Sequence, residues 1–403
     1  MRRLLLAAAL AALAPWAAAQ DTIKIAVLGP MSYVQGQNHW MGAELARDDI
    51  NKAGGVNVGG KKMKIELIQA DTNEIKSVPD AANAVERVIT HDKADFLVGG
   101  FRSEAVLAMQ EVAMDGKKIF LGCGAADGKL GDNVKNNYDR YKYWFRVTPT
   151  KAADLGKTLF TVLASIAGQI RKDLGKPKPK VAILAEKVVW TGAIVKAAQA
   201  NLPKMGMEVV GTWQPSAVAS DLTAELSAIE RAGADIIFTA VSGPAGIVLG
   251  RQMGERKMKA IAFGINVEAQ KDGFWQATAG KANFVSTLDT YGMVEVTPKM
   301  IPFVKEFEAR FGKSPTYNAA TYDAIQMLKE AIEATGGMDN DKIIKYFEGH
   351  EFIGTSGDLK FDDHHDPIWG IGKTSGIAVE WQDGKKVPFW PQNIKGMKPF
   401  LLP

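Results

Sequence analysis

Two glycine-rich stretches contain the residue types of phosphate-binding loops. Gly55, Gly60 and Lys61 match the start of the P-loop pattern, but Lys62 stands where a magnesium-binding Ser or Thr is required. The stretch also follows a helical pattern and precedes a strand-like one. This is the reverse of the order that points a helix N-terminus at phosphate. It is therefore interpreted as the end of a helix and a loop.

The second stretch contains Gly122, Gly124 and Gly128, which follow a strand-like run. Their spacing differs by one residue from the dinucleotide-binding pattern, and Asp127 would repel a pyrophosphate. We therefore expect no cofactor. Glycines after a strand also allow the backbone to approach a small ligand closely.

Side chains suited to catalysis or metal binding are sparse. The pair His364 and His365 lies near acidic residues, but adjacent histidines in a Gly- and Pro-rich tail are more typical of a solvated turn than of a metal site. Cys123, the only cysteine, has no histidine close in sequence and is expected to pack as a small thiol. The G-x-S-x-G pattern of α/β hydrolases does not occur. The sequence thus predicts neither an enzyme nor a metal site.

The secondary-structure elements that would position a site are predicted from a repeating pattern, in which short apolar runs alternate with helical segments. Strand-like and helical segments alternate between residues 23 and 121, and the alternation restarts at residue 181 and continues to residue 263. This pattern predicts parallel sheets covered on both faces. The fold class is therefore α/β, with two doubly wound, Rossmann-like lobes.

The remaining third of the chain has too few strands for another sheet. Helical patterns at residues 303–311, 319–334 and 341–347 are expected to return to the first lobe. The tail from Phe361 is rich in Gly, Pro, Trp and Lys and is expected to be irregular.

The N-terminus has the three parts of a secretory signal peptide. Arg2 and Arg3 precede an apolar run over residues 4–13, and Ala17 and Ala19 form an A-x-A site. The run is shorter than the roughly 20 residues needed to cross a bilayer, which argues against a membrane anchor. We expect cleavage after Ala19 and a location in the periplasm.

Composition is ordinary for a soluble globular protein, with 46% hydrophobic and 23% charged residues. The 384 residues that remain of 403 after the first 19 suit two domains. Removing Arg2 and Arg3 lowers the formal net charge from +4 to +2, so we expect no nucleic-acid partner. A single cysteine permits no intrachain disulfide, and stability must come from packed cores.

Taken in order, the motifs resemble those of the leucine/isoleucine/valine-binding family of periplasmic receptors over essentially the whole mature chain. The resemblance is specific because several common motifs occur in the family's order behind a signal peptide. The motifs are Ile23-Lys24-Ile25-Ala26-Val27-Leu28-Gly29-Pro30-Met31-Ser32, Gly42-Ala43-Glu44, Asp49-Ile50-Asn51 with Gly54-Gly55, Gly99-Gly100, Phe145-Arg146 and Tyr322-Asp323-Ala324.

The resemblance implies a type I periplasmic binding protein, whose two lobes are joined by three crossings and close on a solute. We place the crossings near Pro149, Leu288 and Leu359. One lobe then comprises residues 20–149 and 289–358, and the other residues 150–288 and 359–403. The implied partners are a small-molecule solute and the membrane permease subunits of an ABC importer, with the receptor itself a monomer.

The resemblance also implies site residues in the first lobe. Ser103 matches the family serine that binds the ligand carboxylate, although a serine that opens a helix can instead serve only as its N-cap. Gly124 would offer its carbonyl and Ala126 its backbone N–H, with Ala126 standing where the family often has Thr. Arg102 could add a bidentate carboxylate contact, with a surface salt bridge as the alternative.

Aromatic and polar residues complete the implied site. Trp190 and Ser242 match cleft positions of the second lobe, Ser242 replacing a tyrosine that helps to hold the amine. Tyr317 and Phe101 would add aromatic surface from the first lobe. Gln35 is a further candidate in the shorter first loop, where Trp40 is equally well explained by core packing.

Asn266 marks the main departure from the amino-acid-binding relatives, which place an acidic residue there to pair with the ligand ammonium. A buried unpaired ammonium costs on the order of several kcal/mol. We therefore expect a carboxylate-bearing solute without an α-amine, such as an aromatic or keto acid. Glu186, Glu268 or Asp127 could instead pair with an ammonium, which leaves an amino acid as the alternative. A receptor that signals to a membrane sensor is an alternative of another class.

Overall fold

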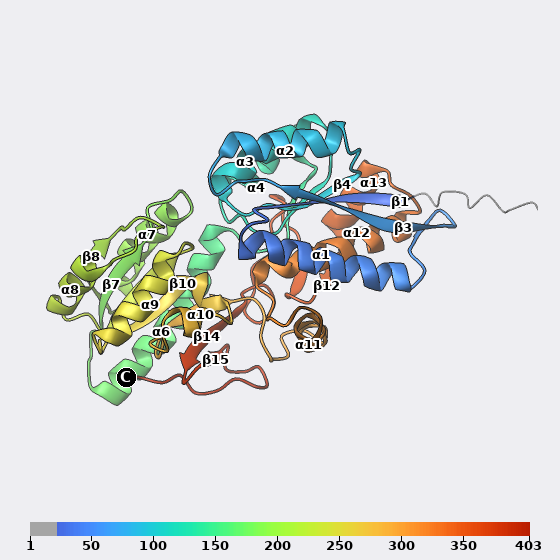
Figure 1. The fold of residues 1–403 in the computed structure, drawn as a ribbon. Helices are drawn as coiled ribbons and strands as arrows, with labels where there is room; N and C mark the ends of the chain where they lie inside the picture. The colour runs from blue at the N-terminus through green and yellow to red at the C-terminus, as the bar shows by residue number, and fades with distance from the viewer. Residues whose placement is uncertain (1–21) are drawn as a thin grey trace, which may run out of the picture.

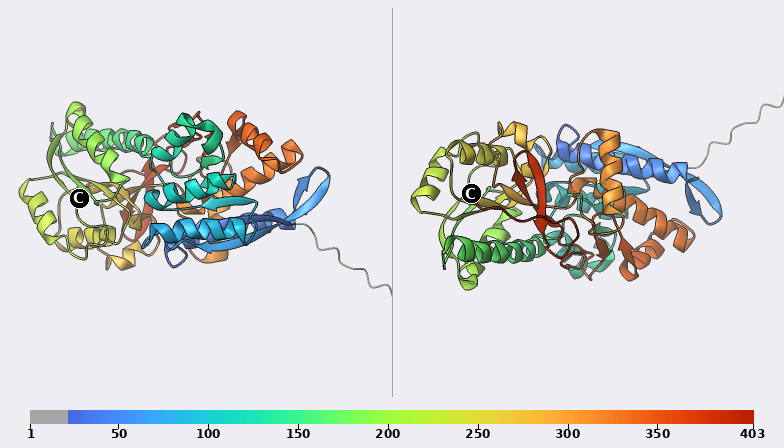
Figure 2. Two further views of the ribbon diagram at one scale, coloured as in Figure 1. Left: turned by 90° about the horizontal axis from the view of Figure 1, so that it is seen from above. Right: turned by 90° about the horizontal axis from the view of Figure 1, so that it is seen from below.

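The computed structural model describes residues 22–403. The expected signal peptide and its cleavage after Ala19 lie outside this range. Two α/β lobes lie next to each other in an elongated molecule, the first drawn mainly in blue, cyan and orange and the second in green and yellow (Figure 1 and Figure 2). None of the helices within residues 22–403 is both long and apolar enough to cross a bilayer.

The first lobe is built on a six-stranded sheet in the order β2-β3-β1-β4-β5-β6. All neighbouring strands run parallel except β2, which is antiparallel to β3. The strand β4 is buried along its whole length, as expected when helices cover both faces. The strands are β1 (Thr22–Gly29), β2 (Val56–Val58), β3 (Lys61–Asp71), β4 (Phe96–Gly99), β5 (Phe120–Gly122) and β6 (Trp144–Arg146).

Helices from both ends of the chain cover this sheet. The helix α2 starts after Ser77, whose Oγ accepts a hydrogen bond of 3.3 Å from the Asp80 N–H. Residues of α12 and α13 share the apolar core of β1 and β4, so these two of the three late helices pack in the first lobe. The elements are α1 (Val34–Lys52), α2 (Val78–Thr90), α3 (Ser103–Asp115), α4 (Lys129–Asn136), α5 (Tyr138–Tyr141), η3 (Tyr317–Ala320), α12 (Thr321–Thr335), α13 (Asn340–Gly349), β12 (Glu351–Ile353) and β13 (Asp358–Lys360).

The second lobe has a parallel sheet in the order β10-β9-β7-β8. Alternate residues of β7 point into two separate cores, with Ile183 on one side and Leu184 on the other. The helices α6 and α7 pack in the first of these cores, whereas α8 and α9 pack in the second. The elements are α6 (Ala152–Leu174), β7 (Lys180–Ala185), α7 (Thr191–Asn201), η1 (Pro203–Met205), β8 (Glu208–Trp213), α8 (Thr223–Arg231), β9 (Ile236–Val241), α9 (Ala245–Glu255), β10 (Ile261–Asn266), η2 (Glu268–Gln270) and α10 (Phe274–Ala277).

The two lobes share one strand order. Leaving aside the antiparallel edge strand β2, the first parallel strand of each lobe lies between the next two: β1 between β3 and β4, and β7 between β8 and β9. This reversal creates a switch point beyond the carboxyl ends of the strands, where open parallel sheets bind ligands. The expected class of two doubly wound α/β lobes is confirmed.

The tail contains a β-hairpin and is not irregular throughout, which corrects the expectation from composition. The strands β14 (Ile377–Gln382) and β15 (Lys385–Trp390) form an antiparallel sheet with β11 (Ser286–Asp289). A bridge between Ala262 and Val285 joins β11 to the edge of the second lobe. Apolar side chains of β14 and β15 are buried there, so the Gly and Trp content reflects a hairpin packed on a sheet.

The chain passes between the lobes after β6, after β11 and again after β13. The helix α11 (Met300–Phe311) packs between α1 and β14. The lobe bounds expected from the sequence stay predictions. Leu359 and Phe361 pack in the core of the first lobe, which favours placing the third crossing between Phe361 and Ile377.

The imidazole of His39 joins three parts of the first lobe. It lies fully buried in α1, with Nε2 3.0 Å from the Cys123 carbonyl and 3.0 Å from the Asn318 side-chain amide. Burial lowers the pKa of His39 from 6.5 to about 4, so the folded protein holds this ring neutral.

A pH dependence of stability follows from His39. Between about pH 4 and 6.5 the unfolded chain binds a proton that the folded protein does not, so this contribution to stability is lost as the pH falls. We expect acidification from pH 6.5 to 4 to cost about 2–3 kcal/mol more in the native protein than in a His39→Gln variant. Chemical denaturation across this range measures the difference. His91→Gln, at a side chain that is 84% exposed, is the matched control. Equal pH slopes in the native protein and the His39 variant would contradict the assignment.

Candidate functional site

A cleft lies between the lobes at the carboxyl ends of their parallel strands. It encloses about 1020 Å³ of space not filled by protein atoms, part of it open to solvent. Its lining comes from the turns after β4, β5, β7, β9 and β10 and from all three crossings. The switch points of both sheets therefore face one shared space.

The turn after β4 is held from below by a buried carboxylate. Gly99 and Gly100 adopt φ of 107° and 79°, and a Cβ on Gly99 would lie 2.2 Å from the Leu28 carbonyl. Glu74 Oε2 then accepts the N–H groups of Phe101 and Arg102 at 2.9 and 2.7 Å. Burial raises the pKa of Glu74 to about 7 although these hydrogen bonds oppose the rise. The turn is fixed before any ligand arrives.

Ser103 opens α3 without acting as its cap. Its Oγ accepts the N–H of Asp127 at 3.2 Å and so joins the turns after β4 and β5. A hydroxyl that accepts one hydrogen bond still has its own proton to donate. Because Ser103 lines the cleft at the start of a helix of 13 residues, that proton and the helix N-terminus are suited to an anion.

The second turn, after β5, needs glycine at its first cleft position. A Cβ on Gly124 would lie 2.2 Å from the Gly100 carbonyl, so the two turns touch through their backbones. Ala126 follows and also lines the cleft, with its carbonyl accepting the N–H of Ala152 at 2.7 Å. The side that faces the cleft is therefore mostly backbone, which suits recognition by N–H and C=O groups.

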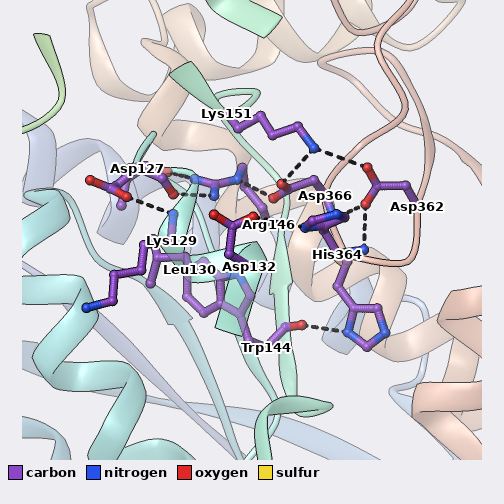
Figure 3. A network of polar contacts seen from close by, with 12 residues as sticks. Asp127, Lys129, Leu130, Asp132, Trp144, Arg146, Lys151, Asp362, His364 and Asp366 are labelled. Atoms are coloured by element: carbon purple, nitrogen blue, oxygen red, sulfur yellow. Dashed lines mark hydrogen bonds and ion pairs between the residues drawn. The ribbon is translucent and has the colours of Figure 1, made fainter. Parts of the chain in front are cut away.

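A buried guanidinium fixes this second turn. Arg146, fully buried in β6, donates to the carbonyls of Ala125 and, at 2.7 Å, Asp127, which flank Ala126 on both sides. Its Nε also contacts Asp366 Oδ1 at 2.6 Å (Figure 3). A single side chain thus connects the turn after β5, which lines the cleft, to the segment that follows β13.

The same network reaches the first crossing. Lys151, just before α6, lies with its Nζ 3.2 Å from Asp362 and 3.3 Å from Asp366 (Figure 3). Charges from the first crossing and from the segment before the third are therefore paired next to the cleft.

In the second lobe, a buried carboxylate organises the wall. Glu186 is fully buried and accepts from the Trp190 indole N–H at 3.2 Å, the Gly243 N–H at 3.0 Å and the Ser242 hydroxyl. With three donors already bound, Glu186 supports Trp190 and Ser242 and is poorly placed to pair with a ligand ammonium.

The remaining aromatic residues face the cleft from the first lobe. The Tyr317 carbonyl accepts from the Thr148 hydroxyl at 2.8 Å, which ties η3 to the first crossing. Burial, with a smaller effect from Glu186 and Glu74, raises the pKa of the Tyr317 phenol. Arg102 lines the rim and forms an ion pair with Glu104. The surface salt bridge considered for Arg102 is thus present.

Eight of the ten candidate residues line this cleft, although their binding of a ligand stays a prediction. They come from both lobes, as a site that closes requires. They are Phe101, Arg102, Ser103, Gly124, Ala126, Trp190, Ser242 and Tyr317.

Asn266 is not among them, and the expectation that it faces the ligand is wrong. It is fully buried at the end of β10, its Nδ2 donating to the Gly246 carbonyl at 3.1 Å and its Oδ1 accepting from the Ala269 N–H at 3.3 Å. Both polar ends of the amide are used inside the second lobe. The absence of an acid there consequently says nothing about a ligand amine.

Gln35 and Trp40 also lie away from the cleft. Gln35 is buried in the first turn of α1, outside the lining, and Trp40 packs against the core of the first lobe. Both sit on a helix that covers the sheet, which explains their burial without a ligand.

Several cleft residues were not predicted from the sequence. Gln270 follows β10, and Asp289 and Thr290 occupy the second crossing. Lys386 lies 2.7 Å from Asp289 and neutralises it. The end of a strand that enters a crossing is a usable signal for Asp289, whereas nothing in the local sequence distinguishes Gln270.

His364 and His365 both contact other residues of the first lobe. His365 stacks on Phe145 with ring centroids 3.9 Å apart, and its Nδ1 lies 2.8 Å from the Trp144 carbonyl. His364 lies 3.2 Å from Asp132, and the neighbouring acids pair with Arg146 and Lys151. Within residues 22–403, no cluster of three or more His, Cys, Asp or Glu is arranged to hold a metal ion.

Comparison with known proteins shows the family. A family model described as periplasmic binding protein matches residues 22–384, and the chain belongs to this family, which places it in the periplasm. An amino acid binding protein of Pseudomonas aeruginosa is 26% identical over 373 residues, covering 90% of this chain and 91% of that protein.

Two solved structures share the fold. A solute-binding protein of an ABC transporter from R. palustris, in complex with benzoate, has a TM-score of 0.74 at 19% identity, covering 91% of this chain and 95% of that one. A branched-chain amino acid transporter substrate-binding protein of Streptococcus pneumoniae, in complex with isoleucine, has a TM-score of 0.74 at 21% identity, covering 94% and 100%.

The Arg146 network yields a stability prediction. Arg146→Met leaves Asp366 buried without its main partner, and we expect a loss of about 3–5 kcal/mol in the free energy of unfolding. Adding Asp366→Asn should recover more than 1 kcal/mol of this loss, because the uncompensated charge is removed. Denaturant titration of the single and double variants measures both effects.

Arg140→Met is the matched control, because Arg140 pairs with Glu111 and Asp115 at the surface. Surface pairs contribute about 0–1 kcal/mol. A loss at Arg146 no larger than the loss at Arg140 would contradict the role given to the network.

Proposed function

We propose that this protein is the periplasmic receptor of an ABC importer and captures a small carboxylate-bearing solute with an apolar body. The observation that carries the proposal is the position of Ser103. Its hydroxyl lines the interlobe cleft at the N-terminus of α3, accepts a hydrogen bond from Asp127 and keeps its proton for a ligand anion.

Three kinds of donor would meet the carboxylate on the first lobe. They are the Ser103 hydroxyl, the N-terminus of α3 and the backbone N–H of Ala126, for which Arg146 holds the flanking carbonyls. Helix N-termini favour anions through their unpaired N–H groups and the helix dipole. Gly124 contributes backbone where a side chain would collide with Gly100.

The rest of the wall is suited to an apolar group. Trp190 and Tyr317 line the cleft from opposite lobes, and aliphatic side chains line much of the remaining wall. The aliphatic lining comprises Val147, Leu155, Val188, Ile265, Val267, Leu288 and Leu359. Burying apolar ligand surface contributes about 25 cal/mol per Å². A benzoate-binding structure among the fold relatives supports an aromatic acid.

Rotation about the three crossings would close the lobes on the solute and exclude water. The closed receptor would then dock on the permease subunits of its importer. We propose cleavage of the signal peptide after Ala19 and action as a monomer, with binding and no turnover as its activity. The class of the relatives, one of them a protein of an ABC transporter, supports this role.

An amino acid is the second candidate. The name of the Pseudomonas relative favours it, as does the Asp289 carboxylate in the lining. That carboxylate is already paired with Lys386, and Glu186 already accepts three hydrogen bonds from the protein. For this reason the simple carboxylate ranks first.

A single-atom change tests the carboxylate site. Ser103→Ala removes a neutral donor to a charged acceptor, and we expect the binding of a carboxylate such as benzoate to weaken by about 1.5–3 kcal/mol. Calorimetric titration measures the loss, after a thermal-shift screen of aromatic acids, keto acids and amino acids has identified the tightest carboxylate. Ligand at 100 times its Kd adds about 2.7 kcal/mol of stability, enough to detect.

Ser220→Ala is the control, because Ser220 is exposed on the second lobe. It should bind as the native protein does. Unchanged affinity in Ser103→Ala, or no stabilisation by any carboxylate, would contradict the proposed function.

A further inference from the structure

Gln270 presents a buried acceptor without a partner. It closes the short turn η2 after β10, is 5% exposed and lines the cleft from the second lobe. Its Nε2 donates to the Leu288 carbonyl at 2.8 Å, whereas its Oε1 has no hydrogen-bond partner. Buried polar atoms are normally satisfied, so an unpaired acceptor on a residue that lines the cleft indicates a missing donor.

The orientation of this amide is fixed by its surroundings. Exchanging the oxygen and nitrogen would place Oε1 against the Leu288 carbonyl, two acceptors facing one another. The backbone carbonyl of Gln270 accepts from Lys386 Nζ at 2.6 Å, which anchors the main chain of η2. Oε1 is consequently held as an acceptor, and rotation of the side chain does not relieve it.

The electrostatics around Gln270 favour a neutral donor. The charged groups beside Gln270 are paired with one another: Lys386 with Asp289 at 2.7 Å, and Lys271 with Glu268 at 2.6 Å. The second Asp289 oxygen accepts from the Thr290 N–H at 2.8 Å. A ligand ammonium here would meet a neutral amide oxygen and a carboxylate that is already neutralised. Desolvation of the ammonium would then be poorly compensated.

We propose that Gln270 is a specificity-determining residue that accepts a hydrogen bond from a hydroxyl or amide N–H of the solute. The substrate class is then apolar carboxylates that carry a neutral hydrogen-bond donor. This proposal rests on the proposed function, because it takes the carboxylate to lie at Ser103. A keto oxygen facing Oε1 would be repelled, so the class differs from the keto acids expected from Asn266.

The contact also links recognition to closure. Ser103 belongs to the first lobe and Gln270 to the second, so a solute that bonds both connects the lobes. A ligand that has both a carboxylate for Ser103 and a neutral donor for Gln270 stabilises the closed state through two contacts. The closed population rises with the difference between the ligand's affinities for the closed and the open state.

A ligand series on the unaltered protein tests the proposal. Calorimetric titration compares benzoate with 3-hydroxybenzoate, 4-hydroxybenzoate and 4-(aminomethyl)benzoate. We expect at least one hydroxybenzoate to bind about five- to tenfold more tightly than benzoate, the usual effect of one added hydrogen bond. The ammonium-bearing acid should bind no better than benzoate.

The variant Gln270→Met keeps the length of the side chain and removes the acceptor. It should lose the preference for the hydroxyl, so that it binds hydroxybenzoate and benzoate with affinities within about twofold of each other. Gln276→Met, at an exposed position on α10 of the same lobe, is the matched control and should keep the preference. Retained binding of benzoate shows that the variant's cleft is folded.

The outcomes separate the two proposals. Binding of benzoate with no gain from either hydroxyl, or a gain that survives in Gln270→Met, overturns the role of Gln270 and leaves the carboxylate receptor standing. A clear preference for the aminomethyl acid overturns the neutral-donor class. Failure of every carboxylate to bind overturns the proposed function, and the role of Gln270 falls with it.

Discussion

A guanidinium withdrawn from water must be surrounded by acceptors, and the way Arg146 meets this requirement shapes the site. Two of its acceptors are the carbonyls on either side of Ala126, and the third is the carboxylate of Asp366. The turn that lines the cleft and the segment leading to the third crossing are thereby held by one group. Lys151 extends the same network to the first crossing. Binding surface and hinge are thus mechanically connected next to the cleft.

The two lobes supply different chemistry to the cleft. The first lobe offers backbone, a hydroxyl and the end of a helix, all suited to an anion. The second offers Trp190, aliphatic surface and the unpaired acceptor of Gln270. Each lobe also has a buried carboxylate that accepts hydrogen bonds from the protein itself. Glu74 supports the turn after β4 in the first lobe, and Glu186 supports the cleft wall of the second. Under the proposed function, selectivity would depend on the few polar atoms of the cleft that the protein leaves unpaired.

The fold could be predicted from the sequence because the periodicities of strands and helices are local signals. Their regular alternation along the chain implies parallel sheets. Prediction from the sequence failed where position depends on distant packing. Asn266 ends a strand at the expected place, yet its side chain turns inward to Gly246 and Ala269, a direction that no local pattern specifies. The hairpin of β14 and β15 was hidden by the composition of the tail. The helix α6, 23 residues long, was not anticipated although it carries the first crossing into the second lobe.

The candidate site divides in the same way. Turns that follow strands, such as those of Ser103 and Ala126, could be located because topology fixes the carboxyl ends of parallel strands. Glu74, Gln270 and Asp289 come from elements whose distance to the cleft is set by tertiary packing, and none belongs to a motif. Sequence reasoning therefore located the turns that line the cleft and missed the lining residues supplied by tertiary packing.

A crystal structure of the protein saturated with its tightest carboxylate is the most direct measurement of the central claim. The account predicts ligand density between closed lobes, with the carboxylate contacting the Ser103 hydroxyl and the Ala126 N–H and with the apolar body between Trp190 and Tyr317. Density outside the interlobe cleft, or a carboxylate directed at the second lobe, would contradict it.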